Sequence, residues 1–369
     1  MTQTSLTNEQ NFFAALDERV GWIQDFLLQD RFLSRFAPDD IREGVAAYIR
    51  YGGKRLRPAI LLFSCGAVGG DEKLAIPAAS AVEVFHTWTL VHDDIIDRDG
   101  TRRGEDTVHE RFRKSMNMRP QYPLSSNEAA HYGVSIAILA GDVQHGWGIS
   151  MMTELTTRNG VDPLTTLHLI NLLDTRVLNT LVEGEVLDVQ FSHLPIEKVD
   201  EKQIVDMLWR KTGVLYEFCA QAGALIGLGK HEPDHPSVNA LGRFSSLCGI
   251  AFQLQDDILG ITGDEKKLGK PVGSDLREGK RTTIASYAYH RASFEQRNRM
   301  DRVLGNSQAT PEDVQAVTEW LIASGGVQYT LDLANGYIKE ALPLLNALPD
   351  TQYRSLLRSW AEFLISRSF

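Results

Sequence analysis

Apolar side chains recur every third or fourth residue along most of this chain, and that spacing restricts it to helical structure. One stripe of this kind consists of Phe12, Leu16, Val20, Ile23 and Leu27. Another consists of Leu164, Leu167, Ile170, Leu173, Val177 and Leu181. Residues with this spacing share one face of an α-helix, whereas a half-buried strand needs strict alternation, which is hard to find here. We therefore predict an all-α fold in a single large domain over residues 1–369, because no stretch is long and polar enough to be a linker.

Charge and cysteine content exclude some classes of function. The chain has 38 basic and 48 acidic residues, a formal net charge of −10, whereas general binding to nucleic acid requires a basic surface. Three cysteines without a CxxC pair argue against a disulfide framework and favour a reducing, cytoplasmic location. No apolar run approaches the roughly 20 residues of a membrane span. We expect no nucleic-acid partner, no signal peptide and no transmembrane segment.

An apolar helical stretch ends in a group of three aspartates, Asp93, Asp94 and Asp97. Residues three and four positions apart are neighbours on a helix, so these carboxylates crowd one another. Two charges ~4 Å apart near a protein surface repel by ~4 kcal/mol at an effective dielectric constant of ~20. Bound divalent cations would reverse the sign of that energy. Oxygen-only ligands suit magnesium, which prefers one or two carboxylates together with phosphate oxygens and water.

A second acidic pair, Asp256 and Asp257, closes another apolar helical run. Both groups stand at the C-terminal end of a helix, where the helix dipole disfavours anions. A solvated helix end is an adequate explanation for either group alone. For the two together, a shared metal site explains what local helix energetics do not.

Basic residues are concentrated beside these acidic groups. They include Lys54, Arg55 and Arg57 before a predicted helix, Arg102 and Arg103 after the first aspartates, Lys211 within a helix, and Lys270 and Lys280 in a late loop. Each could be an ordinary surface charge. Together with the aspartates, they indicate a small and highly anionic ligand, with magnesium bridging carboxylates to phosphates and Arg or Lys taking the remaining oxygens.

Taken together and in their order along the chain, the acidic and basic motifs resemble those of the trans-isoprenyl diphosphate synthases, the head-to-tail polyprenyl synthetases. The resemblance runs from about Gly52 to Thr283 and rests on Gly53-Lys54-Arg55-Leu56-Arg57-Pro58, Asp93-Asp94-Ile95-Ile96-Asp97, Arg102-Arg103-Gly104, Gly184-Glu185-Val186-Leu187-Asp188, Lys211-Thr212, Phe252-Gln253-Leu254-Gln255-Asp256-Asp257, Gly269-Lys270 and Gly279-Lys280. It implies an all-helical bundle of the isoprenoid synthase type around a central cavity, usually as a homodimer.

The resemblance also implies a role for each matching residue. Asp93, Asp94, Asp97, Asp256 and Asp257 would hold magnesium, roughly three ions per active site with two on the first motif. The allylic diphosphate (dimethylallyl, geranyl or farnesyl) would contact Arg102, Lys211 and Lys270. Isopentenyl diphosphate would bind the Gly53 backbone, Lys54, Arg57, His86 and Arg103, while Lys280 would complete the substrate site. Thr212 and Gln253 would stabilise a developing carbocation, and the departing diphosphate would take the proton that is lost.

Two positions depart from the family pattern, and two more bear on product length. Glu185 stands where family members often carry Gln, and Gly260 stands where a third aspartate would complete the second motif. Trp88 and Thr89 precede Asp93 by five and four residues, positions that help to set the floor of the product tunnel in the family. A bulky indole predicts a short product, geranylgeranyl or farnesyl diphosphate, with geranylgeranyl diphosphate synthases the most similar group. An ideal helix turns Trp88 away from Asp93, so a tryptophan packed against a neighbouring helix is the alternative.

Three functions are compatible with two aspartate motifs. The first is a magnesium-dependent prenyltransferase that joins isopentenyl diphosphate to allylic diphosphates. The second is a class I terpene cyclase or a head-to-head synthase, and a cyclase would not need the second diphosphate site indicated by Lys54, Arg57 and Arg103. The third is a non-catalytic subunit of a synthase, which would usually have lost one aspartate motif. We expect the first.

Overall fold

The computed structural model describes residues 8–119, 121, 124–263 and 273–366 and is helical almost throughout, which confirms the all-α prediction. The described residues form two compact units. Of these residues, the N-terminal unit contains 10–119, 121, 124–170 and 222–232, and the C-terminal unit contains 8–9, 171–221, 233–263 and 273–366. The expectation of one domain over residues 1–369 stays a prediction.

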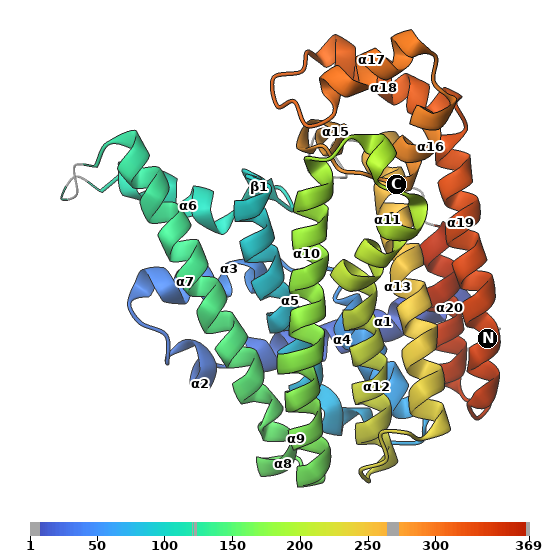
Figure 1. Ribbon diagram of the computed structural model, residues 1–369. Coiled ribbons are helices and arrows are strands. Elements are labelled where there is room, and N and C mark those ends of the chain that lie inside the picture. The colour runs from blue at the N-terminus through green and yellow to red at the C-terminus, as the bar shows by residue number, and fades with distance from the viewer. Residues whose placement is uncertain (1–7, 120, 122–123, 264–272, 367–369) are drawn as a thin grey trace, which may run out of the picture. The chain divides into compact units, whose positions relative to one another are not determined.

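The N-terminal unit is built from helices and one short hairpin (Figure 1). Its elements are α1 (Asn8–Leu27), α2 (Asp30–Leu33), α3 (Asp39–Arg50), α4 (Leu56–Ala67), η1 (Glu72–Ala75), α5 (Ile76–Ile96), β1 (Thr101–Arg102), β2 (Glu105–Asp106), α6 (Val108–Asn117), α7 (Ser126–Met152), α8 (Glu154–Thr157) and α9 (Pro163–Leu172). The first two residues of α1 and the last two of α9 belong to the C-terminal unit.

The packing of α5 against α7 organises this unit. Small residues let the two helices approach closely: a Cβ atom built on Gly141 of α7 would lie only 2.2 Å from Nε2 of His92 on α5. Helix α7 begins at a capping box in which Ser125 and Glu128 each bond the other's backbone N–H, which satisfies donors that the first helical turn leaves unpaired. The apolar stripe predicted at the N-terminus is α1, which buries Phe12, Leu16, Ile23 and Leu27.

The helix that ends in the first aspartates is apolar along most of its length. Residues Glu72–Ile96 are long and apolar enough to cross a membrane by length and composition, with a mean hydropathy of 1.3 over the best window. However, 67% of that window is buried inside the protein. Alanines and valines raise the average without forming an uninterrupted run, and a core helix of a globular protein has the same character.

The C-terminal unit is helical in all its described elements. They are η2 (Leu173–Val177), α10 (Leu178–Ser192), η3 (Ile196–Lys198), α11 (Glu201–Leu208), η4 (Trp209–Gly213), α12 (Val214–Leu228), whose last residues belong to the N-terminal unit, α13 (Pro236–Thr262), α15 (Ser274–Glu278), α16 (Thr283–Arg291), α17 (Phe294–Val303), α18 (Pro311–Ala323), α19 (Gly326–Ala341), η5 (Leu342–Ala347) and α20 (Gln352–Ser366).

Helix α13 is the centre of this unit and packs against α19, α20 and η4 (Figure 1). Pro236 opens α13, where its missing N–H costs nothing, and the His235 side chain accepts a hydrogen bond from the Ser237 N–H. Near its middle, the rings of Tyr216, Phe252 and Trp360 cluster, with centroids 5.8 and 5.4 Å from that of Tyr216. This core holds the second aspartate motif in place, because the motif lies on the same helix.

Candidate active site

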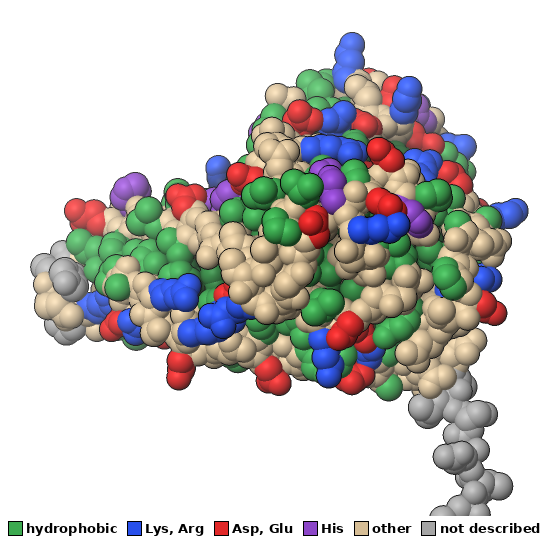
Figure 2. Space-filling model, turned by 90° about the horizontal axis from the view of Figure 1, so that it is seen from below, with side chains coloured by type: hydrophobic (Ala, Val, Ile, Leu, Met, Phe, Trp, Pro, Cys, Tyr) green, Lys and Arg blue, Asp and Glu red, His purple; other side chains and the backbone are tan. Residues whose placement is uncertain are grey.

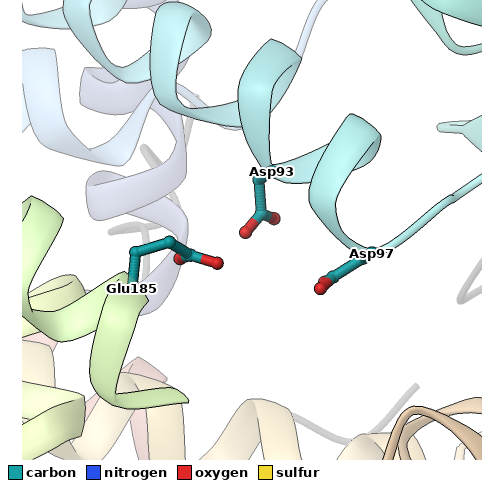
Figure 3. Close-up of side chains that lie close together, drawn as sticks. All are labelled: Asp93, Asp97 and Glu185. Carbon is teal, nitrogen blue, oxygen red and sulfur yellow. The ribbon is translucent and has the colours of Figure 1, made fainter. Parts of the chain in front are cut away.

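Two of the three aspartates at the end of α5 lie together and partly exposed. Asp93 is in the last turn of the helix and Asp97 is its C-terminal cap. Their carboxylate oxygens lie within 4.8 Å of each other, and both side chains leave the end of α5 on the same side (Figure 3). The spacing of four residues produces this arrangement, as the sequence predicts.

Asp94 has different surroundings. It is buried, its two oxygens lie 2.8 and 2.9 Å from Nε of Arg102, and one of them also accepts a hydrogen bond from the Tyr48 hydroxyl. The Tyr48 oxygen in turn accepts a bond from the Val108 N–H at 3.1 Å. Burial raises the pKa of Asp94, while Arg102 and Tyr48 act to lower it. Among the described residues, Arg102 therefore fixes the Asp94 carboxylate by hydrogen bonds.

The short hairpin between β1 and β2 brings two arginines back toward α5. Arg103 and Gly104 form its turn, with φ values of 57° and 80°, the left-handed conformation that two-residue hairpin turns require. Arg102, on the strand just before the turn, reaches Asp94. Arg103, within it, has its guanidinium only 2.8 Å from where a Cβ atom on Gly53 would lie. A side chain at position 53 would displace that guanidinium, so this approach requires glycine.

Three of the residues predicted to bind isopentenyl diphosphate gather with Gly53 in the N-terminal unit. Arg57 Nη1 lies 3.0 Å from Nε2 of His86. Burial lowers the pKa of His86 well below its usual value, and the charges of Arg57, Arg103 and Arg102 lower it further. A neutral imidazole can accept the hydrogen bond from Arg57, so the cluster presents guanidinium groups next to an uncharged ring.

A buried ion pair beneath this cluster was not predicted from the sequence. Arg55 Nη1 lies 2.8 Å from Oε1 of Glu83, and their side chains are 1% and 5% exposed. Arg55 has a left-handed φ of 43° and also donates to the Ile49 carbonyl at 2.8 Å. Burial raises the pKa of Glu83, although Arg55, Arg103 and Arg57 lower it. The signal that could have revealed the pair was the single carboxylate of Glu83 in the otherwise apolar start of α5.

In the C-terminal unit, Lys211 and Thr212 lie on η4, one turn of π-helix between α11 and α12. Single π turns inside helices often mark functional sites. Lys211 Nζ lies 2.9 Å from Glu185 and 2.8 Å from Asp188, both on α10 (Figure 3 labels Glu185). The close approach depends on Gly184, because a Cβ there would lie 2.5 Å from the Lys211 backbone nitrogen. Glu185, which departs from the family pattern, thus pairs with a predicted substrate-binding lysine.

The second aspartate motif lies near the end of α13, next to Thr212. The Thr212 hydroxyl donates to Oε1 of Gln253 at 3.0 Å, and Gln253 Nε2 lies 3.4 Å from Oδ1 of Asp257. Burial, reinforced by the charges of Asp275 and Asp256, raises the pKa of Asp257 well above its usual range. Asp256 is more exposed than Asp257, so it is the better placed of the two to meet a ligand from solvent.

Of the two lysines predicted in the late loop, Lys280 lies within the described residues. Lys280 lies 3.7 Å from Oδ1 of Asp275 and 2.9 Å from Glu278. Lys270 falls outside the described residues. Lys54, in the N-terminal unit, is exposed on the loop before α4.

The two residues predicted to limit product length lie on different sides of α5. Trp88 packs among rings: its centroid lies 5.0 Å from that of Phe85, 5.7 Å from His92 and 5.2 Å from His145 on α7. The Thr89 hydroxyl instead donates to the His86 carbonyl at 2.8 Å. Trp88 therefore packs against α7, and whether it also limits product length stays a prediction.

The first aspartates and the predicted isopentenyl diphosphate residues belong to the N-terminal unit, and Lys211, Gln253 and the second aspartates belong to the C-terminal unit. That the two aspartate motifs bind one diphosphate stays a prediction.

On the face drawn in Figure 2, Lys and Arg side chains are interspersed with Asp and Glu rather than joined in a continuous basic strip.

Comparison with known proteins identifies the family. The polyprenyl synthetase family model matches residues 39–321. Geranylgeranyl diphosphate synthase of Methanosarcina mazei is 34% identical over 340 residues, 92% of this chain and 94% of that protein. Geranylgeranyl pyrophosphate synthetase of Pyrococcus horikoshii, a crystal structure, is 32% identical with a TM-score of 0.81 over 98% of this chain and 100% of that one.

A further crystal structure shows a bound ligand and metal. It is geranylgeranyl pyrophosphate synthase from Corynebacterium glutamicum complexed with isoprenyl diphosphate and magnesium, which is 26% identical with a TM-score of 0.80. It covers 98% of this chain and 100% of its own. On these matches together with the motifs and the helical fold, the chain belongs to the polyprenyl synthetase family and is a prenyltransferase.

Proposed function

We propose that this prenyltransferase joins isopentenyl diphosphate head-to-tail to allylic diphosphates and that its main product is geranylgeranyl diphosphate. The observation that carries the proposal is the cluster of Arg57, His86 and Arg103 around Gly53. It provides cations for a diphosphate in addition to those at the aspartate motif. A terpene cyclase, which ionises one diphosphate, has no use for it.

Magnesium fits the residues at the end of α5. Asp93 and Asp97 offer only oxygen ligands, partly exposed and within 4.8 Å of each other, which is the donor set that magnesium prefers when it bridges to phosphate. Asp256 would hold a further ion, so that roughly three ions serve each site. When bound, magnesium neutralises the charge that develops on the departing diphosphate. Asp94 has a supporting role, since Arg102 and Tyr48 occupy its oxygens.

The protein's own groups would divide the remaining work. Arg57 and Arg103 would seat the diphosphate of isopentenyl diphosphate, and His86 would fix Arg57 by accepting its hydrogen bond. The Thr212 and Gln253 oxygens would face the allylic cation and stabilise its positive charge. Apolar side chains beside the aspartates of α5 would exclude water, which would otherwise convert the cation into an alcohol.

The family comparisons and Trp88 support the proposed product length. Two relatives matched over more than nine-tenths of this chain, those of Methanosarcina mazei and Pyrococcus horikoshii, are geranylgeranyl diphosphate synthases. The indole of Trp88 would then limit growth of the chain beyond that product. Farnesyl diphosphate is the alternative product.

We propose a cytoplasmic homodimer as the working form of the enzyme. Helix α10 exposes Val182, Val186 and Val189 to solvent, at 47%, 48% and 38%. Spacings of four and three residues place them on one face of the helix. An apolar helix face of this kind is suited to a second copy of the chain, because exposed apolar stripes mark association surfaces.

An assay with isopentenyl and dimethylallyl diphosphates and magnesium tests the proposed reaction. Elongated linear diphosphates, identified by mass, support it; a hydrocarbon indicates a cyclase, and activity only after addition of a partner indicates a non-catalytic subunit. Asp93→Ala should lower kcat by about 100- to 1,000-fold, because it removes a ligand to charge-neutralising metal. Asp142→Ala, an exposed aspartate on α7, is the control and should retain wild-type activity. An active Asp93→Ala variant would contradict the assignment of the metal site.

A further inference from the structure

The glycine at position 260 is explained by a neighbour from another helix. Gly260 lies one turn after Asp256 on α13, where the family motif carries a third aspartate. A Cβ atom built on Gly260 would lie 2.6 Å from Oδ2 of Asp275 and 3.6 Å from its Cγ. The Asp275 carboxylate therefore occupies the space that a side chain at position 260 would need. Residues four apart share a helix face, so that carboxylate lies on the same face as Asp256.

Backbone contacts bring Asp275 to this position. It lies on the short helix α15, which begins after Gly273, a residue with a left-handed φ of 78°. The Gly273 N–H donates to the Gly260 carbonyl at 3.3 Å, and the Lys280 N–H donates to the Asp275 carbonyl at 3.0 Å. The first bond ties the start of α15 to α13 at Gly260 itself. The position of the carboxylate thus follows from the path of the backbone.

A second observation indicates that a cation belongs here. Asp257 is only 7% exposed, and its Oδ2 atom is buried without a hydrogen-bond partner in the described part of the chain. A buried carboxylate oxygen without a donor is costly unless a ligand satisfies it. Asp257 interacts electrostatically with Asp275, Asp256 and Lys280, so the unsatisfied oxygen belongs to the same group of side chains. Three neighbouring carboxylates repel one another, and a divalent cation would add to the positive charge of Lys280, whose Nζ lies 3.7 Å from Asp275.

We propose that Asp275 supplies the third carboxylate of the second aspartate motif, in place of the side chain missing at Gly260, and that with Asp256 it faces magnesium bound to a diphosphate. The motif is then assembled from two helices, with α13 contributing two aspartates and α15 the third. This inference rests on the proposed function, since the diphosphate is the substrate group that the ion would bind.

Exchanging the two side chains tests the proposal. Binding of inorganic pyrophosphate to the full chain is measured by calorimetry with and without magnesium. Asp275→Ser should weaken the magnesium-dependent affinity about tenfold, the scale seen when a carboxylate near a metal is lost. Gly260→Asp alone should also weaken it about tenfold, because two carboxylates would then compete for one space. The double variant Gly260→Asp/Asp275→Ser should return to within about threefold of wild type, a non-additive result.

A matched pair on another helix provides the control. Gly336 and Asp332 both lie on α19, and a Cβ on Gly336 would meet no atom within 4 Å, so the same two substitutions are made where no carboxylate fills the space beside the glycine. Gly336→Asp, Asp332→Ser and their combination should leave pyrophosphate affinity unchanged. Asp275→Asn, which keeps the size of the side chain, covers the case in which Gly260→Asp does not fold. It should show the same loss of about tenfold, and wild-type affinity in this variant would overturn the proposal.

Three other outcomes would also overturn it. Losses that multiply in the double variant would show that the two positions act independently. Recovery of the melting temperature without recovery of magnesium-dependent affinity would make Asp275 a packing neighbour of Gly260 and nothing more. A wild-type chain that neither binds pyrophosphate with magnesium nor elongates allylic diphosphates would refute the proposed function and this inference with it, whereas an active wild type with additive losses refutes the inference alone.

Discussion

Trp88 shows how one residue can serve both packing and specificity. Its ring lies against Phe85, His92 and His145, yet the side chain is not completely buried. Trp88→Ala should open space beside α5 and shift the main product to one or more additional isoprene units, measured by mass analysis of dephosphorylated products. Trp320→Ala, in the C-terminal unit, is the control and should leave the distribution unchanged. An unaltered distribution in Trp88→Ala would remove the tryptophan from the product tunnel.

His86 gives a pH dependence whose sign can be worked out. Burial and neighbouring arginines lower its pKa well below the ordinary value, so the unfolded chain takes up a proton near pH 6.5 while the folded chain does not. Stability should therefore fall as pH decreases below about 6.5, by about 1 kcal/mol one unit lower. His86→Asn should show a shallower decrease in the free energy of unfolding, measured by urea denaturation from about pH 8 to about pH 5.5. Equal slopes in the two proteins would contradict a neutral buried His86.

At the scale of elements, the contact between α10 and η4 decides where Lys211 lies. Gly184→Ala would place a methyl group 2.5 Å from the Lys211 nitrogen and 2.8 Å from the Arg210 carbonyl carbon, both on the backbone, so neither can give way cheaply. We expect a loss of about 1–3 kcal/mol in the free energy of unfolding, and a decrease in kcat because Lys211 moves with η4.

The matched variant for this test is Gly336→Ala in α19, where the added methyl meets no atom within 4 Å. It should stabilise the protein by about 0.5–1 kcal/mol, because alanine is the better helix former. Urea denaturation measures both variants. If Gly184→Ala were as stable as Gly336→Ala, the close approach of α10 to η4 would not be needed.

At the scale of the whole molecule, the proposed homodimer can be separated from the chemistry. Val186→Glu places a charge in the middle of the exposed apolar face of α10, so the assembly should dissociate to half its mass by light scattering at micromolar concentration. Ile322→Glu, at a similarly exposed isoleucine of α18 (47%), should leave the mass unchanged. A wild-type chain that is monomeric at the same concentration would refute the dimer.

The helical fold and much of the candidate site could be predicted because their signals are local. The spacing of apolar residues predicts helices such as α1, and the spacing of Asp93 and Asp97 places two carboxylates together at the end of α5. The resemblance added Gly53, Arg57, His86 and Arg103, which the structure brings into one cluster. Each of these predictions depends on residues a few positions apart or on an ordered set of motifs.

Other features depend on contacts between distant residues. The sequence does not reveal that Tyr48 and Arg102 donate hydrogen bonds to the Asp94 carboxylate. Nor does it reveal that Arg55 is buried against Glu83 or that Asp275 lies beside Gly260. The β-hairpin that carries Arg103 and the π turn that carries Lys211 also could not be predicted from the helical spacing of apolar residues. The spacing of apolar residues indicates which face of a helix is buried, because each turn of the helix places apolar side chains on that face. Which charged group meets which is decided only when helices pack, since that pairing depends on the path of the backbone in three dimensions.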